Sequence, residues 1–157
     1  MHRDARARHE LGFSLVEVIL ALALLGTVLI AMSGLFTLGS RQVDAGRKHS
    51  EALSAAQDIL EEISVWSFRG LYERFGGDGS TPTFTIDTLT NDFAKKWQPY
   101  LAENFAEGTF AEISLSSVTD SGTPPPLSSA RCIRITVTVH WAEALRERSV
   151  QLTMLRL

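Results

Sequence analysis

The sequence predicts an α+β fold in which a long N-terminal helix packs on a C-terminal antiparallel β-sheet. Residues 13–39 form a nearly continuous apolar run, and apolar residues then recur at helical spacing over residues 52–66. Apolar and polar residues alternate over residues 133–154, which is the pattern of half-buried strands. No proline interrupts residues 13–81, so one helix can join the first two regions.

Length and composition exclude several classes of protein. The chain has 157 residues and a formal net charge of -3, with 45% hydrophobic and 21% charged residues. This length suits one domain, and a chain this hydrophobic is not intrinsically disordered. A mildly acidic chain predicts no nucleic-acid partner, because such proteins carry a basic excess. The single cysteine, Cys132, excludes an intramolecular disulfide and a multi-cysteine metal site.

The apolar run is long enough to cross a membrane. Val18–Ser40 is an uncharged stretch of 23 residues, and a spanning helix needs about 20. A buried core helix would usually show a polar stripe, and a secretory signal has an apolar region of only about 7–15 residues. We therefore expect a membrane segment. Arg3, Arg6 and Arg8 precede it and favour a cytoplasmic N-terminus.

Glu17 is the only charged residue within residues 13–39. An ionisable group in a membrane segment is costly unless it is hydrated or paired. Glu17 lies only about 6 Å along a helix from Phe13, so the headgroup region could keep it hydrated. Alternatively, its carboxylate pairs with a positive charge from another chain.

The segment around Glu17 carries a family resemblance. Gly12-Phe13-Ser14-Leu15-Val16-Glu17, placed after a short basic stretch and before the apolar run, resembles the type IV prepilin signature. The resemblance is strongest over residues 8–40. It implies a pilin fold with four parts, namely a leader peptide (1–12), a transmembrane and filament-core helix (13–39), an amphipathic helix half (40–69) and a globular antiparallel β domain (70–157).

The resemblance also implies how the chain is processed and with what it interacts. A prepilin peptidase would cleave between Gly12 and Phe13, and the same enzyme family would N-methylate Phe13. Glu17 would neutralise the terminal ammonium of Phe13 on a neighbouring subunit and so set the register of assembly. The implied partners are this peptidase and methyltransferase, other pilin or pseudopilin subunits, the assembly platform with its ATPase, and membrane lipid.

Apolar spacing predicts that the second half of the helix packs on its own domain. Ala52, Ala56, Ile59, Ile63 and Trp66 share one helical face, with Leu53 and Leu60 beside it. The stripe is too short to indicate a coiled coil. The basic residues Arg41, Arg47 and Lys48 form either a solvated face or a contact with lipid headgroups and acidic neighbours.

The C-terminal region reads as short strands joined by loops. Strands are expected at residues 81–88 and 109–118, and 120–129 is expected to be a loop because it contains three successive prolines. Residues 89–105 are ambiguous, since Asn91-Asp92 could cap a short helix that Pro99 interrupts. Residues 133–141 and 150–154 predict a C-terminal hairpin.

The search for reactive groups yields no catalytic residue, metal site or cofactor site. The four histidines, at positions 2, 9, 49 and 140, lack metal-ligand spacing, and Asp78 and Asp87 are too sparse for calcium. Cys132 has no nucleophile signature and is expected to be a small buried or edge residue. Trp66, Trp97 and Trp141 are expected to pack into the domain. We therefore expect a protein that is not an enzyme.

The function implied is that of a minor pilin-like structural subunit. It would sit in the bacterial cytoplasmic (inner) membrane with a single span and its C-terminal domain outside, and then enter a type IV pilus or a periplasmic pseudopilus. A minor pseudopilin of a type II secretion system has the same N-terminus, although the C-terminal hairpin favours a minor pilin. An unprocessed, signal-anchored binding module is the alternative from another class.

Overall fold

The computed structural model describes residues 14–105, 108–120, 122–143 and 146–157. Its contacts divide the chain into two compact units, with the boundary between Asp44 and Ala45. Helix α1 (Leu15–Ser64) begins in the first unit and ends in the second, and it continues through Gly34. Each unit is described by itself below.

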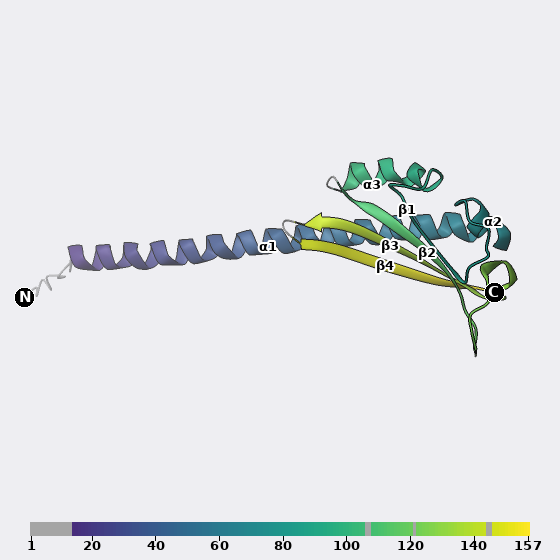
Figure 1. Ribbon diagram of the computed structural model, residues 1–157. Coiled ribbons are helices and arrows are strands. Elements are labelled where there is room, and N and C mark those ends of the chain that lie inside the picture. The colour runs from purple at the N-terminus through teal and green to yellow at the C-terminus, as the bar shows by residue number, and fades with distance from the viewer. Residues whose placement is uncertain (1–13, 106–107, 121, 144–145) are drawn as a thin grey trace, which may run out of the picture. The chain divides into compact units, whose positions relative to one another are not determined.

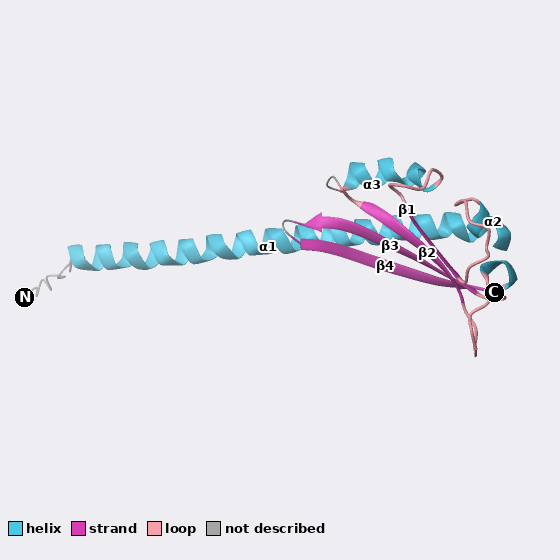
Figure 2. Ribbon diagram, viewed as in Figure 1, coloured by secondary structure: helices cyan, strands magenta, loops and turns pink. Residues whose placement is uncertain are grey.

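The second unit is built on one antiparallel sheet. Its strands are β1 (Thr83–Asp87), β2 (Phe110–Ser117), β3 (Ile133–Glu143) and β4 (Arg146–Arg156), in the order β1-β2-β3-β4 (Figure 1). The part of α1 within this unit lies along one face of the sheet, as the colouring by secondary structure shows (Figure 2). The predicted α+β class, with a long helix on an antiparallel sheet, is confirmed.

Alternation of side chains along the strands creates the core. The inward residues of β3 from Ile133 to Trp141 are all buried, and Ile113 of β2 lies opposite Val137 in the register. On the helix, the small residues Ala52, Ala55 and Ala56 are buried against the sheet. The predicted hairpin and helix face are confirmed, with one correction. Leu53 is 40% exposed, because it directly follows the buried Ala52 and its side chain is therefore rotated by about 100° away from the buried face.

Helix α1 ends at Ser64, short of residue 69, and a second helix follows. The backbone N–H of Trp66 donates to the Ile63 carbonyl, and Ser67 is extended. The Ser67 Oγ then accepts a hydrogen bond from the Gly70 N–H at 3.1 Å and caps α2 (Phe68–Glu73). Trp66 is buried as expected, although it lies after the end of α1.

The ambiguous segment between β1 and β2 is helical. Asn91 Oδ1 accepts hydrogen bonds from the N–H groups of Phe93 and Ala94 and so caps a short 3₁₀ helix, η1 (Ala94–Trp97). Helix α3 (Gln98–Asn104) follows directly. The expectation that Pro99 interrupts the helix is wrong, because Pro99 lies in the first turn of α3, where no backbone donor is needed.

The proline-rich loop contains a further short helix. The 3₁₀ helix η2 (Leu127–Ser129) follows Pro126 within the segment expected to be a loop. Leu127 is buried in the core, and its N–H donates to the Thr81 carbonyl at 2.9 Å. The burial of Leu127 and this hydrogen bond therefore hold the loop against the segment that precedes β1.

Lys96, Glu62 and a set of aromatic rings connect α1 to η1. Lys96 Nζ pairs with a Glu62 oxygen, and Trp97 Nε1 donates to the other at 2.9 Å. The Lys96 ammonium lies 4.2 Å from the centroid of the Phe93 ring and 4.6 Å from that of the Trp97 ring. The Lys96 ammonium also lies 5.5 Å from the centroid of the Trp66 ring, which packs edge-on to Phe93. The expected packing of Trp66 and Trp97 in the domain is confirmed.

The Glu62 carboxylate should make stability depend on pH. Burial raises the pKa of Glu62, but hydrogen bonds from Lys96 and Trp97 and the charges of Lys96 and Arg74 lower it more, so the net pKa is below its ordinary value. A lowered folded-state pKa gives stability that is complete above the unfolded-state pKa of about 4.3 and is lost as pH falls through the folded-state value.

We expect Glu62→Gln to lower the stability of the chain near pH 7 by about 0.5–1 kcal/mol, since the contact is partly exposed. Thermal unfolding from pH 7 to pH 3 measures the difference, which should shrink towards zero at the acid end. Glu61→Gln is the matched control, because Glu61 accepts from Gln57 on the same helix instead. An equal pH dependence for both variants would contradict the assignment.

Candidate functional site

Glu17 lies in the first turn of α1. The backbone N–H groups of Glu17 and Val18 both donate to the Ser14 carbonyl, at 2.9 and 3.2 Å. A carboxylate in the first turn is favoured by the positive end of the helix dipole. Ser14 and Glu17 also have the spacing of a capping box, a signal that the search for reactive groups had not used. The Glu17 side chain is exposed.

The other residues expected at this site, Gly12 and Phe13, lie outside the described residues. The structure therefore places Glu17 alone among the three. Within residues 14–157, as far as they are described, no ion pair is recorded for its carboxylate. A partner for Glu17 therefore lies outside the described residues, among residues 1–13, in lipid or water, or on another molecule.

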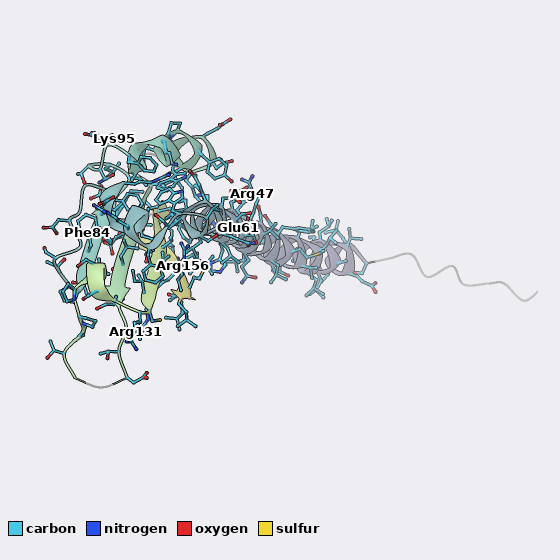
Figure 3. All side chains as sticks on the ribbon, turned by 90° about the vertical axis from the view of Figure 1, so that its right-hand side faces the viewer. Arg47, Glu61, Phe84, Lys95, Arg131 and Arg156 are labelled. Carbon is cyan, nitrogen blue, oxygen red and sulfur yellow. The ribbon has the colours of Figure 1, made fainter. Side chains whose placement is uncertain are left out.

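The apolar run is exposed around the whole helix. Fifteen large apolar side chains between Leu15 and Leu38 are each 47–76% exposed. They point in every direction around the helix axis, as the side-chain view shows (Figure 3). The most apolar stretch of α1 has a mean hydropathy of 2.6 and none of it is buried within the chain. A helix that is apolar on all sides has to be covered by lipid or by other helices.

The two threonines in this run are hydrogen-bonded within the helix itself. Thr27 Oγ1 donates to the Leu24 carbonyl at 2.8 Å, and Thr37 Oγ1 donates to the Ser33 carbonyl at 3.0 Å. Hydroxyls bonded to the preceding turn leave no donor facing hydrocarbon. Length, composition and hydrogen bonding thus agree with a helix that can cross a membrane.

Charged residues return immediately after the run. Arg41, Asp44, Arg47 and Lys48 lie within the next turns of α1. Arg47 Nη1 is 3.4 Å from Glu51 Oε1, an exposed pair one turn apart that contributes little stability. The charge-free stretch is therefore bounded by Glu17 at one end and by a mixed cluster of charges at the other.

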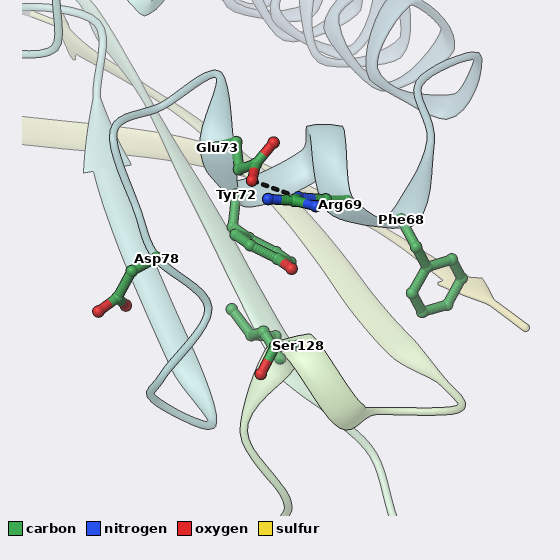
Figure 4. Close-up of a pocket in the computed structure, with 7 residues that line it drawn as sticks. Phe68, Arg69, Tyr72, Glu73, Asp78 and Ser128 are labelled. Atoms are coloured by element: carbon green, nitrogen blue, oxygen red, sulfur yellow. Dashed lines mark hydrogen bonds and ion pairs between the residues drawn. The ribbon is translucent and has the colours of Figure 1, made fainter.

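A cavity of about 440 Å³ lies in the second unit between α2, the following loop and η2 (Figure 4). Its polar lining includes Arg69 and Glu73, which form an ion pair with each other, and Asp78. Hydrogen bonds from Ser80 hold the pKa of Asp78 below its ordinary value. Ser128 also lines the cavity, but the lining residues include no histidine or cysteine that could activate it.

The remaining candidate side chains, His140, Trp141 and Cys132, are all at least partly buried in the second unit. Among the described residues, no group of three or more His, Cys, Asp and Glu side chains could hold a metal ion. The His140 ring stacks on Phe110 on the outward face of the sheet, as expected for an outward strand residue. Trp141 is buried beside Phe105. Cys132 is half-buried, just before β3.

Comparison with family models identifies the N-terminal segment. The model described as the prokaryotic N-terminal methylation motif matches residues 7–33. The chain carries the type IV prepilin leader signature. No curated protein and no solved structure matches the chain.

The signature supports a type IV pilin-like or pseudopilin precursor. Proteins with this motif are structural rather than catalytic, and the signature implies interaction with a prepilin peptidase and with other pilin-type subunits in general. It also indicates a membrane-anchored protein, in agreement with the exposed apolar helix. The match covers Glu17 and most of the apolar run, whose described large apolar side chains are exposed.

Proposed function

We propose that this prepilin-type chain is a minor pilin-like structural subunit that is processed in the cytoplasmic membrane and assembled into a pilus-like filament. One observation carries the proposal. Glu17 lies in the first turn of a helix that is otherwise uncharged as far as Ser40 and is exposed on all sides. A membrane anchor alone needs only the apolar side chains, whereas a filament subunit also needs a charge with which a neighbouring chain can pair.

A neighbouring subunit supplies the group that Glu17 lacks. Cleavage between Gly12 and Phe13 creates a new terminal ammonium, which stays cationic after N-methylation. In an environment of low dielectric, this cation and a carboxylate attract each other strongly, whereas either group alone is costly. Pairing Glu17 of one subunit with Phe13 of the next therefore fixes how far one helix is displaced along the other.

The order of the chain assigns a role to each segment. Residues 1–12 act as the leader, 13–39 as the membrane and filament-core helix, 40–69 as the amphipathic segment, within which α1 ends at Ser64, and 70–157 as the globular domain. The arginines of the leader keep the N-terminus in the cytoplasm, so the globular domain lies outside. During assembly the apolar helix leaves lipid and becomes covered by equivalent helices, so its apolar surface remains out of water.

The test is the mass of the native N-terminus. The chain is purified from the membrane fraction of cells that express the prepilin peptidase, and its N-terminal peptide is sequenced by mass spectrometry. We expect a chain that begins at Phe13 with a methylated amino group. Recovery of intact Met1 would refute processing and favour a signal-anchored binding module. A terminus at Phe13 without any filament-associated protein would refute the assembly role alone.

A further inference from the structure

The two edges of the sheet are built differently. Strand β4 pairs with β3 along its whole length of 11 residues, and no described strand lies on its other side (Figure 1). The opposite edge, β1, has only five residues and follows Pro82. Asp87 closes that strand by accepting hydrogen bonds from the N–H groups of Leu89 and Thr90, both at 2.8 Å. The long free edge therefore belongs to β4.

The middle of β4 lacks the features that normally protect an edge strand. Residues 149–155 contain no charge, proline or glycine. Natural edge strands are usually short or carry such residues, because their free N–H and C=O groups otherwise pair with other chains. The inward side is also incompletely covered, since Val150 is buried but Leu152 and Met154 are only half-buried. The edge offers both backbone groups and a partly open apolar row.

Two arginines flank this row on the same face. Arg148 and Arg156 lie opposite the buried residues Trp141 and Ile133 of β3, so both belong to the inward face. Arg148 Nε is 3.3 Å from a Glu143 oxygen. The Arg156 guanidinium lies 5.7 Å from the centroid of the Phe68 ring, at the labelled position in Figure 3.

Arg156 has an unmet hydrogen-bonding requirement. Its Nη1 atom is buried and has no hydrogen-bond acceptor among the described residues. A buried donor on a cation is costly when it is unpaired, and a carboxylate is its strongest partner. Nη1 itself is shielded from solvent, but Arg156 as a whole is only half-buried and forms no ion pair with a described residue. Its positive charge therefore favours an acidic group from outside the domain at the end of the apolar row.

A second copy of this strand fits the edge poorly. Antiparallel pairing of two β4 strands about Gln151 would place Arg146 of each copy opposite Arg156 of the other. Like charges directly opposite one another destabilise a strand pair. Such pairing also brings no carboxylate to Arg156, so the charges of the edge point to a different partner.

We propose that the free edge of β4 binds an extended segment of another protein chain as a fifth strand. This segment carries apolar residues at alternate positions, which cover Val150, Leu152 and Met154, and a carboxylate at each end, next to Arg148 and Arg156. Backbone hydrogen bonds supply the affinity of such strand addition, and the alternating side chains supply its specificity. The inference does not depend on leader cleavage or on filament assembly.

The test uses two synthetic peptides and the full, uncleaved chain in detergent micelles. Each peptide has nine residues with alternating threonine and valine, and the ends are glutamate in one and lysine in the other. Amide hydrogen exchange of residues 149–155 is measured with and without peptide. Alternate amides of this stretch already donate to β3, so the measured set is the one that faces the free edge. We expect the glutamate peptide to slow exchange at those amides roughly tenfold and the lysine peptide to have little effect.

Charge reversal provides the matched comparison. Arg156→Glu should reverse the preference, so that the lysine peptide protects β4 more than the glutamate peptide. Arg134→Glu is the control, because Arg134 lies opposite Leu155 at the same end of the sheet but on the outward, exposed face. This variant should keep the original preference. Should Arg156→Glu fail to fold, Arg156→Gln is expected to weaken the discrimination between the peptides.

Three results would overturn the proposal. The first is equal protection by both peptides, which would remove the role of the arginines. The second is the absence of protection at residues 149–155 with either peptide. The third is protection that rises with the concentration of the chain alone, which would mean that a second copy occupies the edge.

Discussion

Glu17→Val is expected to reduce incorporation of the chain into filaments roughly tenfold or more while leaving leader cleavage intact. Removing one partner of a desolvated ion pair costs about 3–5 kcal/mol, since the other charge is left uncompensated. The proposed cleavage lies between Gly12 and Phe13, about one helical turn before Glu17, so we expect processing not to need this carboxylate. The measurement compares the amount of the chain in sheared filaments with the amount of cleaved chain in the membrane. Glu17→Ala should behave in the same way.

Thr27→Val is the control for this experiment. Thr27 is also a polar residue in the apolar run, but its hydroxyl is bonded within the helix to Leu24. This variant should enter filaments at the normal level. Normal incorporation of Glu17→Val would exclude the proposed pairing with Phe13, and loss of cleavage in that variant would move the role of Glu17 to recognition by the peptidase.

Gly12→Val is expected to block processing and thereby everything that follows from it. A protease binds its substrate as an extended backbone, and a branched side chain next to the cleaved bond prevents close approach. A displacement of about 1 Å at a reacting bond can cost roughly 10²-fold in rate. The chain should therefore accumulate in the membrane with Met1 intact, which mass spectrometry of the N-terminal peptide would show.

Ala7→Val supplies the matched control for the leader. It adds the same side chain five residues before Gly12, within the leader but away from the bond to be cut. Cleavage of this variant should proceed normally. If Gly12→Val were cleaved at the normal rate, the proposed cleavage position would be wrong, and the leader would have to end elsewhere.

Much of the fold could be predicted because local patterns decide it. The alternation of Ile133 to Trp141 requires only that one face of a strand is buried, and the structure places that face in the core. Features set by distant contacts were missed. The end of α1 at Ser64 depends on Trp66 turning into a cluster with Phe75 and Phe93, and spacing along the helix does not contain that information.

The two candidate sites also differ in how far the sequence alone could identify them. Gly12, Phe13 and Glu17 lie within one short segment, so the sequence alone could single them out, and their roles still await the experiments above. Arg156 could not be singled out. Its position beside the apolar row depends on the register between β3 and β4, and its contact with Phe68 joins residues that are distant in the chain.

The division of the chain near Ala45 has a consequence for how its sequence can vary. Between Leu15 and Leu38 the large apolar side chains of the first unit are exposed, so they have to suit surroundings outside the chain, which under the proposed function are a bilayer and other helices. These surroundings restrict which residue types the N-terminal segment can carry, and a family model recognises the resulting pattern. The second unit needs only a filled core, and many combinations of apolar residues fill a core equally well. In a protein built in this way, the residues of the globular domain can change while those of the N-terminal segment stay the same.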